Sequence, residues 1–188
     1  MNYKRIFDII TATILLSILC IPMLLIALMV KISSSGPILY WSDRVGINNI
    51  IFRMPKFRTM RLDTPEMATH LMKDPDRYLT SVGSFLRKLS LDELPQLWSI
   101  SKGDMSFIGP RPALYNQEDL VDLRTKKGIH RLVPGVTGWA QVNGRDDIPI
   151  PLKVEYDEYY MNNRSIILDL KIAWMTFFNV LSKRGIKH

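Results

Sequence analysis

Residues 9 to 30 read IITATILLSILCIPMLLIALMV, and this run carries no charged side chain. A straight helix of that length would extend about 33 Å, which matches the hydrocarbon thickness of a bilayer. Pro22 lies within the run, where a proline removes a backbone hydrogen bond and clashes with the preceding turn. The run therefore predicts a membrane helix that either spans the bilayer or breaks at Pro22 and returns to the side from which it entered.

The charges that flank this run do not define its orientation. Lys4 and Arg5 precede it, Lys31 follows it, and the remainder of the chain is also basic, so the positive-inside rule finds no asymmetry. From these residues alone, a spanning helix is favoured over a re-entrant one. A cleaved signal peptide is disfavoured because no small-residue cleavage site closes the run.

A turn-rich stretch over residues 33–37 separates the apolar run from a mixed sequence that is typical of a globular domain. The length of 188 residues supports one compact domain with an appended element, but hardly two full domains. We therefore divide the chain into a membrane anchor over residues 1–32 and a globular domain over residues 33–188.

The globular part contains signals for both strands and helices. Short apolar runs at residues 38–41 and 50–53 are separated by turn residues and predict a β-hairpin. Residues 62–77 carry prolines and many charges, which predict a loop, whereas residues 78–89 predict a helix. The expected fold class is α+β and predominantly helical, with a small core that includes a short β-hairpin.

Apolar residues near the C-terminus recur at helical spacing. They are Ile166, Leu170, Ala173, Trp174, Phe177 and Leu181. Such a stripe usually faces a core, and this is the favoured interpretation. The bulky Trp174 and Phe177, followed by Lys183, Arg184 and Lys187, equally suit a helix that lies at a membrane surface.

The net charge of +7 predicts an acidic partner, which can be nucleic acid, anionic lipid or a phosphorylated substrate. Nucleic acid is disfavoured because the basic residues are scattered and no helix-turn-helix, zinc-finger or aromatic RNA-binding signature is present. The single cysteine, Cys20, excludes an internal disulfide and a cysteine-built metal site, and it fits a cytoplasmic setting. Lipid and phosphate remain as partners.

The string Ser90-Leu91-Asp92-Glu93-Leu94-Pro95 places two adjacent carboxylates where a helix is expected to begin. Its simplest interpretation is structural, because Ser90 and Glu93 match a capping box. A helix N-terminus would also favour the ionised form of Asp92 and the binding of phosphate. Asp92 and Glu93 are therefore candidate catalytic residues.

Basic residues lie in several segments that suit an anion. Arg87 shortly precedes the two carboxylates, Lys56 follows the expected hairpin, with Arg58 nearby, and Arg145 ends a glycine-containing segment. Arg111 lies between two prolines, which stiffen the backbone around a guanidinium that can hold phosphate with two parallel hydrogen bonds. A rigid turn is the alternative there. We predict that Lys56, Arg87, Arg111 and Arg145 bind substrate phosphate.

Other motifs give weaker signals. Asp74 and Asp76 form a D-x-D pattern, which some nucleotide-sugar glycosyltransferases use to hold a metal, but it lies in a proline-containing loop. The three histidines have no metal-ligand spacing, and the Walker, G-x-G-x-x-G, HExxH and G-x-S-x-G motifs are missing.

Four ordered blocks of sequence resemble the bacterial monotopic phosphoglycosyl transferases, in particular the small members that consist only of the catalytic core. The blocks are KFRTM at residues 56–60, SLDELPQL at 90–97, GDMSFIGPRP at 103–112 and PGVTGWAQVNGR at 134–145. The similarity extends from residues 4–8 to residues 168–171. Residues 146–152, with Pro149 and Pro151, depart from the pattern of the small members and leave the sugar undefined.

The resemblance implies a re-entrant helix with Pro22 at its break and a globular part at the cytoplasmic face of the bacterial inner membrane, where it meets membrane lipids. It reverses the preference for a spanning helix. It further implies that Asp92 is the nucleophile and a metal contact, that Glu93 is its catalytic partner, and that Mg²⁺ is required. A homo-oligomer is compatible with the sequence.

The expected reaction transfers a sugar 1-phosphate from a UDP-sugar to undecaprenyl phosphate, releases UMP and passes through a covalent aspartyl intermediate. It would be the first membrane step of glycoconjugate assembly. Two alternatives stay open at this point. One is a membrane-bound glycosyltransferase that uses the D-x-D pattern, and the other is a non-enzymatic basic membrane adaptor.

Overall fold

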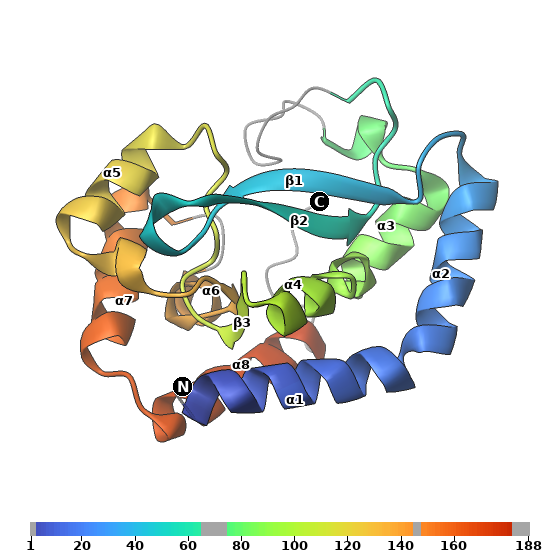
Figure 1. Ribbon diagram of the computed structural model, residues 1–188. Helices are drawn as coiled ribbons and strands as arrows, with labels where there is room; N and C mark the ends of the chain where they lie inside the picture. The colour runs from blue at the N-terminus through green and yellow to red at the C-terminus, as the bar shows by residue number, and fades with distance from the viewer. Residues whose placement is uncertain (1–2, 65–74, 145–147, 182–188) are drawn as a thin grey trace.

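The computed structural model describes residues 3–64, 75–144 and 148–181, which form a mostly helical α+β structure (Figure 1). This agrees with the expected fold class. The helices are α1 Tyr3–Ile18, α2 Cys20–Ser33, α3 Ser81–Lys88, α4 Gln96–Lys102, α5 Glu118–Lys126, α6 Trp139–Gly144, α7 Ile150–Asn162 and α8 Ile166–Leu181. The strands are β1 Leu39–Val45, β2 Ile51–Phe57, β3 Ser106–Ile108 and β4 Gly135–Thr137.

The apolar N-terminal run forms two helices, α1 and α2, which meet at an angle of 63°. The break lies at Leu19, so the prediction of a break at Pro22 is corrected by three residues. Pro22 lies in the first turn of α2, and α1 ends at Ile18, whose carbonyl a residue at position 22 would have bonded in a continuous helix. Among the described residues, only the two helices taken together have the length and apolar character of a membrane segment, and neither has them alone.

Polar side chains hold the beginning of α1 against the globular part. Asp8 is buried and accepts a hydrogen bond of 2.7 Å from the hydroxyl of Ser106 on β3. Arg5 donates to the carbonyl of Ile100 at 2.8 Å, and Lys4 Nζ lies 2.5 Å from a carboxylate oxygen of Asp169 on α8. The first turns of α1 are therefore docked on the core.

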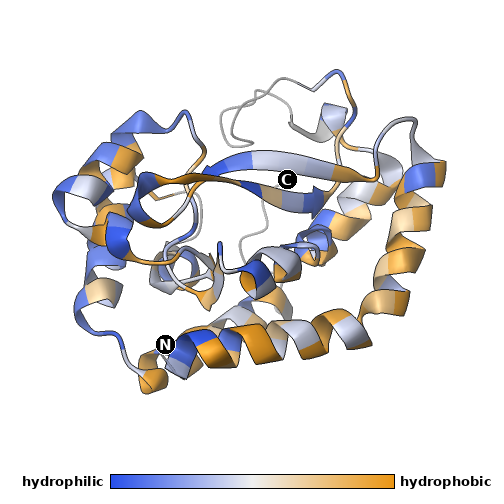
Figure 2. Cartoon of the chain, viewed as in Figure 1, coloured by the Kyte–Doolittle hydropathy of each residue, from blue (hydrophilic) through white to orange (hydrophobic). Residues whose placement is uncertain are grey.

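The end of α2 is held by the same globular part. Arg58, which directly follows β2, is buried and donates to the carbonyls of Ser34 and Ser35 at the C-terminal end of α2. A cation favours that end of a helix, where carbonyl groups lack partners. Both ends of the bent pair thus contact one body, while the helices between these ends present an apolar surface (Figure 2).

The predicted hairpin is confirmed, with longer strands than expected. β1 and β2 pair antiparallel from Leu39 opposite Phe57 to Val45 opposite Ile51. The connection includes Asn48 and Asn49, which both adopt the left-handed conformation that asparagine tolerates better than most residues. Lys56 is the penultimate residue of β2 and lies opposite Tyr40 of β1. Figure 1 shows the hairpin above α4.

A second sheet joins β3 and β4, which pair parallel with Ser106 opposite Gly135 and Ile108 opposite Thr137. The sequence did not predict these strands because three residues are too few to show a period of two. A Cβ on Gly135 would lie only 2.1 Å from the backbone nitrogen of Gly109, so this pairing needs a glycine.

The C-terminal helix α8 contradicts the favoured interpretation of its apolar stripe. Ile166, Leu170, Trp174 and Phe177 are all exposed, by 77%, 65%, 66% and 57% of their surface. The residues of α8 that do enter the core are Leu168 and Ile172. Spacing alone could not select the buried face, because both faces of this helix are apolar.

The predicted helix at residues 78–89 is confirmed from Ser81, where α3 begins. Thr80 caps it by accepting a 2.9 Å hydrogen bond from the backbone nitrogen of Gly83. A Cβ on Gly83 would lie 2.0 Å from the carbonyl oxygen of Thr59, which means that α3 packs directly on the chain that follows β2.

The close approach of Gly83 to Thr59 predicts that Gly83→Ala lowers stability, the opposite of its effect in a free helix. In a free helix, Gly83→Ala would stabilise by about 0.5–1 kcal/mol. We expect the clash with Thr59 to outweigh this and to lower the free energy of unfolding by about 1–3 kcal/mol in a denaturant titration. The neighbouring change Ser84→Ala serves as the control and should alter stability by less than about 0.5 kcal/mol. A stabilised Gly83→Ala variant would contradict the observed packing.

Candidate active site

The two candidate carboxylates lie in a short 3-10 turn, Leu91–Glu93, that precedes α4. Ser90 enters this turn in the left-handed conformation, with φ at 55°, and its side chain makes no capping hydrogen bond. The capping-box interpretation is therefore wrong, and Asp92 does not lie in the first turn of α4. A non-glycine residue in this conformation is strained, and such strain is frequent at functional sites.

Glu93 is bound by two of the predicted phosphate-binding residues. Its Oε1 atom accepts a hydrogen bond of 2.6 Å from Lys56 Nζ and another of 2.8 Å from an Nη atom of Arg111. Lys56 comes from the hairpin and Arg111 from the loop after β3. The fold thus brings together three residues that the sequence had proposed separately.

The charges around Glu93 decide its protonation. Burial by itself would raise the pKa of Glu93, but the nearby charges of Arg111 and Lys56, and the hydrogen bonds that both donate, hold that pKa well below its ordinary value. The two cations therefore favour the ionised form of Glu93.

Asp92 has the opposite environment. Its surface is only 7% exposed, and burial raises the pKa of Asp92 above the ordinary value, assisted by the negative charge of Glu93 and opposed by Lys56, Arg87 and Arg111. Two adjacent carboxylates with pKa values shifted in opposite directions are typical of sites that carry out acid, base or nucleophilic chemistry.

Arg87 joins this group from the last turn of α3. Its Nε atom donates a 3.0 Å hydrogen bond to the hydroxyl of Thr59, which is itself buried. Thr59 thus holds the Arg87 side chain in place and was not among the predicted site residues, although it lies within the KFRTM block. Arg58, by contrast, is directed to the end of α2 and does not contribute a cation to the site.

Three of the four predicted phosphate-binding residues, Lys56, Arg87 and Arg111, therefore surround the two carboxylates. Arg145 lies outside the described residues. So does Asp74 of the D-x-D pattern, and the side chain of Asp76 is likewise not described.

The metal ligation expected of Asp92 stays a prediction. In residues 3–64, 75–144 and 148–181, no three His, Cys, Asp or Glu side chains are close enough to hold a metal ion together. Mg²⁺ does not need such a cluster, because it commonly binds one or two carboxylates together with substrate phosphates and water. The buried carboxylate of Asp92 fits that kind of site.

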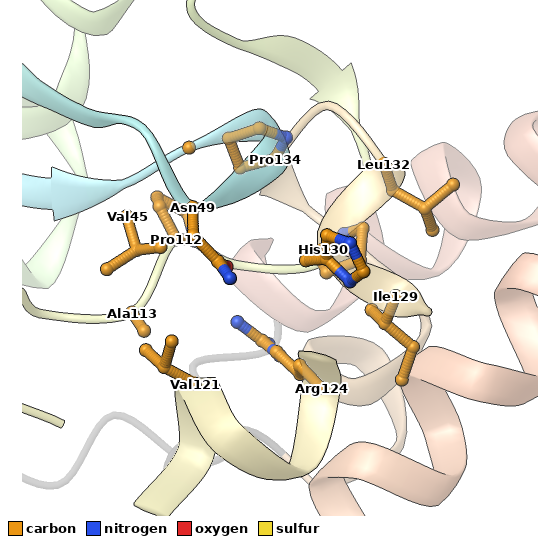
Figure 3. Close-up of a pocket in the computed structure, with 12 residues that line it drawn as sticks. Val45, Asn49, Pro112, Ala113, Val121, Arg124, Ile129, His130, Leu132 and Pro134 are labelled. Carbon is orange, nitrogen blue, oxygen red and sulfur yellow. The ribbon is translucent and has the colours of Figure 1, made fainter. Parts of the chain in front are cut away.

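A small cavity lies beside the loop that carries Arg111 (Figure 3). Pro110 and Pro112 line it from that loop, Arg124 from α5, and His130 from the segment before β4. Neither Asp92 nor Glu93 lines this cavity, so the cavity is separate from the candidate active site.

Comparison with known proteins identifies a family. The model of a family described as bacterial sugar transferase matches residues 1–183. The chain is 41% identical to a protein of Bacillus subtilis (strain 168) named uncharacterized sugar transferase EpsL, covering 100% of this chain and 91% of that protein.

Two relatives have names that state a reaction. UDP-N-acetylgalactosamine-undecaprenyl-phosphate N-acetylgalactosaminephosphotransferase of Aeromonas hydrophila is 37% identical over 97% of this chain. Undecaprenyl-phosphate glucose phosphotransferase of Komagataeibacter xylinus is 39% identical, also over 97% of this chain. The chain spans 44% and 36% of these two proteins, which are therefore more than twice as long as the matching part.

The two carboxylates should have opposite effects on stability at neutral pH. The raised folded-state pKa of Asp92 means that its ionised form is disfavoured by folding, so Asp92→Asn should raise the melting temperature. The lowered pKa of Glu93 means that its ion pairs stabilise the fold above the unfolded-state pKa and are lost as the pH falls through the folded-state pKa. Glu93→Gln should therefore cost about 1–3 kcal/mol at pH 7.

The control is Asp122→Asn, at an exposed position of α5, which should leave the melting temperature unchanged. If Asp92→Asn and Glu93→Gln shifted the melting temperature in the same direction, the assigned environments would be incorrect.

Proposed function

The chain belongs to the bacterial sugar transferase family and is thereby a phosphoglycosyl transferase, and we propose that it transfers a sugar 1-phosphate from a UDP-sugar to undecaprenyl phosphate with release of UMP. The observation that carries this proposal is the buried carboxylate of Asp92 among Lys56, Arg87 and Arg111. Cations in this arrangement suit the diphosphate of a nucleotide sugar, and the carboxylate suits attack on it.

In the proposed first step, an Asp92 carboxylate oxygen attacks the phosphorus that bears the sugar. A new bond forms between this oxygen and phosphorus, the bond to the bridging oxygen breaks, and UMP leaves with the electron pair. In the second step, a phosphate oxygen of undecaprenyl phosphate attacks the same phosphorus and the Asp92 carboxylate leaves. The relay avoids having two phosphorylated substrates react directly in one small site.

The environment of Asp92 supports its role as a nucleophile. A carboxylate with a raised pKa is more basic and less solvated than an ordinary one, and both properties favour attack. The nearby Lys56 and Arg87 oppose that rise in pKa and so keep the carboxylate available in its ionised form. From the sequence, a helix N-terminus was expected to favour the ionised form of Asp92. In this proposal the charges of Lys56 and Arg87 have that effect instead.

We propose a modified role for Glu93. Paired with Lys56 and Arg111, the Glu93 carboxylate holds both cations next to Asp92. The diphosphate of the substrate would compete with Glu93 for these cations, because phosphate oxygens and a carboxylate accept the same hydrogen bonds. Glu93 then acts as a positioning residue for the phosphate-binding pair.

Mg²⁺ would be held by Asp92 together with the substrate phosphates, and when bound it would neutralise part of the diphosphate charge. The described residues supply the other positive charges of the site, with Lys56 and Arg111 directed to Glu93 and Arg87 held by Thr59.

We further propose that the α1–α2 pair is re-entrant and that the globular part lies at the cytoplasmic face of the bacterial inner membrane. Because Arg5 and Asp8 bind one end of the pair to the core and Arg58 binds the other, the two ends would have to leave the core to reach opposite faces of a membrane. The exposed Trp174 and Phe177 of α8 suit a helix lying at the lipid surface.

The covalent relay predicts a burst of product without acceptor. Enzyme mixed with the correct UDP-sugar and Mg²⁺, but without undecaprenyl phosphate, should release about one UMP per active site and gain a sugar-phosphate mass on the peptide that contains Asp92. A panel of UDP-sugars identifies the donor. Asp92→Asn should abolish both signals, whereas the surface variant Asp122→Asn should keep both. Release of UMP only after undecaprenyl phosphate is added, with no adduct, would rule out the covalent step.

The re-entrant topology predicts that both ends of the anchor face the same compartment. In a Cys20→Ser background, single Asn2→Cys and Ser35→Cys variants should both react with an impermeant thiol reagent in inside-out vesicles and both be protected in intact cells. Reaction of the two cysteines from opposite sides would show a spanning helix.

A further inference from the structure

The loop that carries Arg111 is held through its carbonyl oxygens. Pro110 and Pro112 have no backbone N–H to donate, so the backbone of this loop can be held mainly by hydrogen bonds to its carbonyl oxygens. Four consecutive carbonyls each accept a hydrogen bond: Pro110 from Gly135 at 2.9 Å, Arg111 from Arg124 at 2.9 Å, Pro112 from Arg44 at 3.2 Å and Ala113 from Val45 at 3.0 Å. The position of Arg111 therefore depends on the groups that donate to this loop.

The donor to the Arg111 carbonyl is a buried, ion-paired side chain. Arg124 is 8% exposed, and its Nε and Nη2 atoms lie 3.0 Å and 2.6 Å from one carboxylate oxygen of Asp157, which is 1% exposed. Its remaining nitrogen, Nη1, donates to Arg111. Figure 3 shows Arg124 extending from α5 toward Pro112.

We propose that Arg124 and Asp157 are positioning residues for the phosphate-binding guanidinium of Arg111, a role that rests on the proposed function. Asp157, on α7, orients the Arg124 fork and neutralises its charge. Arg124, on α5, then holds the peptide between Arg111 and Pro112. With its backbone held in this way, the Arg111 side chain reaches Glu93. In the reaction it would reach the diphosphate from the same backbone position.

The fork geometry is essential to this role. A guanidinium can bind a carboxylate with two nitrogens while a third bonds elsewhere in the same plane, whereas an ammonium is a single point of contact on a flexible stem. Arg124→Lys keeps the buried positive charge but cannot reproduce both contacts. The exposed ion pair between Lys127, which directly follows α5, and Glu158 on α7 also links these two segments, so Lys127→Gln is a matched control.

The first test needs no activity. If Arg124 places Arg111 on Glu93, the loss of melting temperature caused by Glu93→Gln should be reduced, to roughly half, in an Arg124→Lys background. The same loss should be unchanged in a Lys127→Gln background. Strict additivity of Arg124→Lys with Glu93→Gln, two residues that share no direct contact in the structure, would overturn the proposal.

The second test uses transfer kinetics with the donor identified by UMP release. Arg124→Lys should lower kcat/KM on the order of 10-fold, and the loss should vanish in an Arg111→Ala background. A loss of the same size in both backgrounds would assign Arg124 a purely structural role. Absence of transfer by the unaltered protein would reject the proposed function, while the melting-temperature cycle would still decide the positioning role.

Should Arg124→Lys fail to fold, Asp157→Asn replaces it in the melting-temperature cycle. It preserves the shape of the side chain and one acceptor but removes the charge that orients the fork. It should reduce the effect of Glu93→Gln in the same direction, and an unreduced effect would overturn the proposal.

Discussion

The ion pairs of Glu93 with Lys56 and Arg111 determine the arrangement of the candidate site. They join the hairpin, the turn before α4 and the loop after β3, which are separated by 37 and 18 residues along the chain. Because one carboxylate oxygen accepts from both cations, its removal would leave two positive charges facing each other in a partly buried region. The same contact ties these three segments together and places phosphate-binding groups next to Asp92.

The environment of Asp92 differs from that of Glu93 although the two are neighbours in sequence. Glu93 binds two cations directly, whereas for Asp92 burial has a larger effect than the surrounding positive charges. The strained turn that begins at Ser90 is what allows successive side chains to enter such different surroundings. A regular capping box would have turned Glu93 back on its own helix instead.

Apolar contacts also connect helix α2 to this site. Ile26 and Val30 of α2 pack with Phe57 of β2 and Leu86 of α3 in one buried cluster. Leu86 immediately precedes Arg87, and Phe57 immediately follows Lys56. Part of the surface on which α2 packs is thus formed by the neighbours in sequence of two site residues, so Lys56 and Arg87 occupy defined positions relative to α2.

The sequence by itself determined the features that depend on local pattern and residue chemistry. These are the hairpin, the helix before the carboxylates, a helix break within one turn of Pro22, and the identity of Asp92, Glu93, Lys56, Arg87 and Arg111 as candidate site residues. Only the tertiary structure decided which face of α8 is buried, that β3 pairs with β4, that Arg58 binds the end of α2, and that Arg124 joins Asp157 to the carbonyl of Arg111. Local pattern reports backbone preference and the spacing of apolar side chains. Burial, pairing between distant segments and the pKa values that follow from them arise only when the whole chain packs.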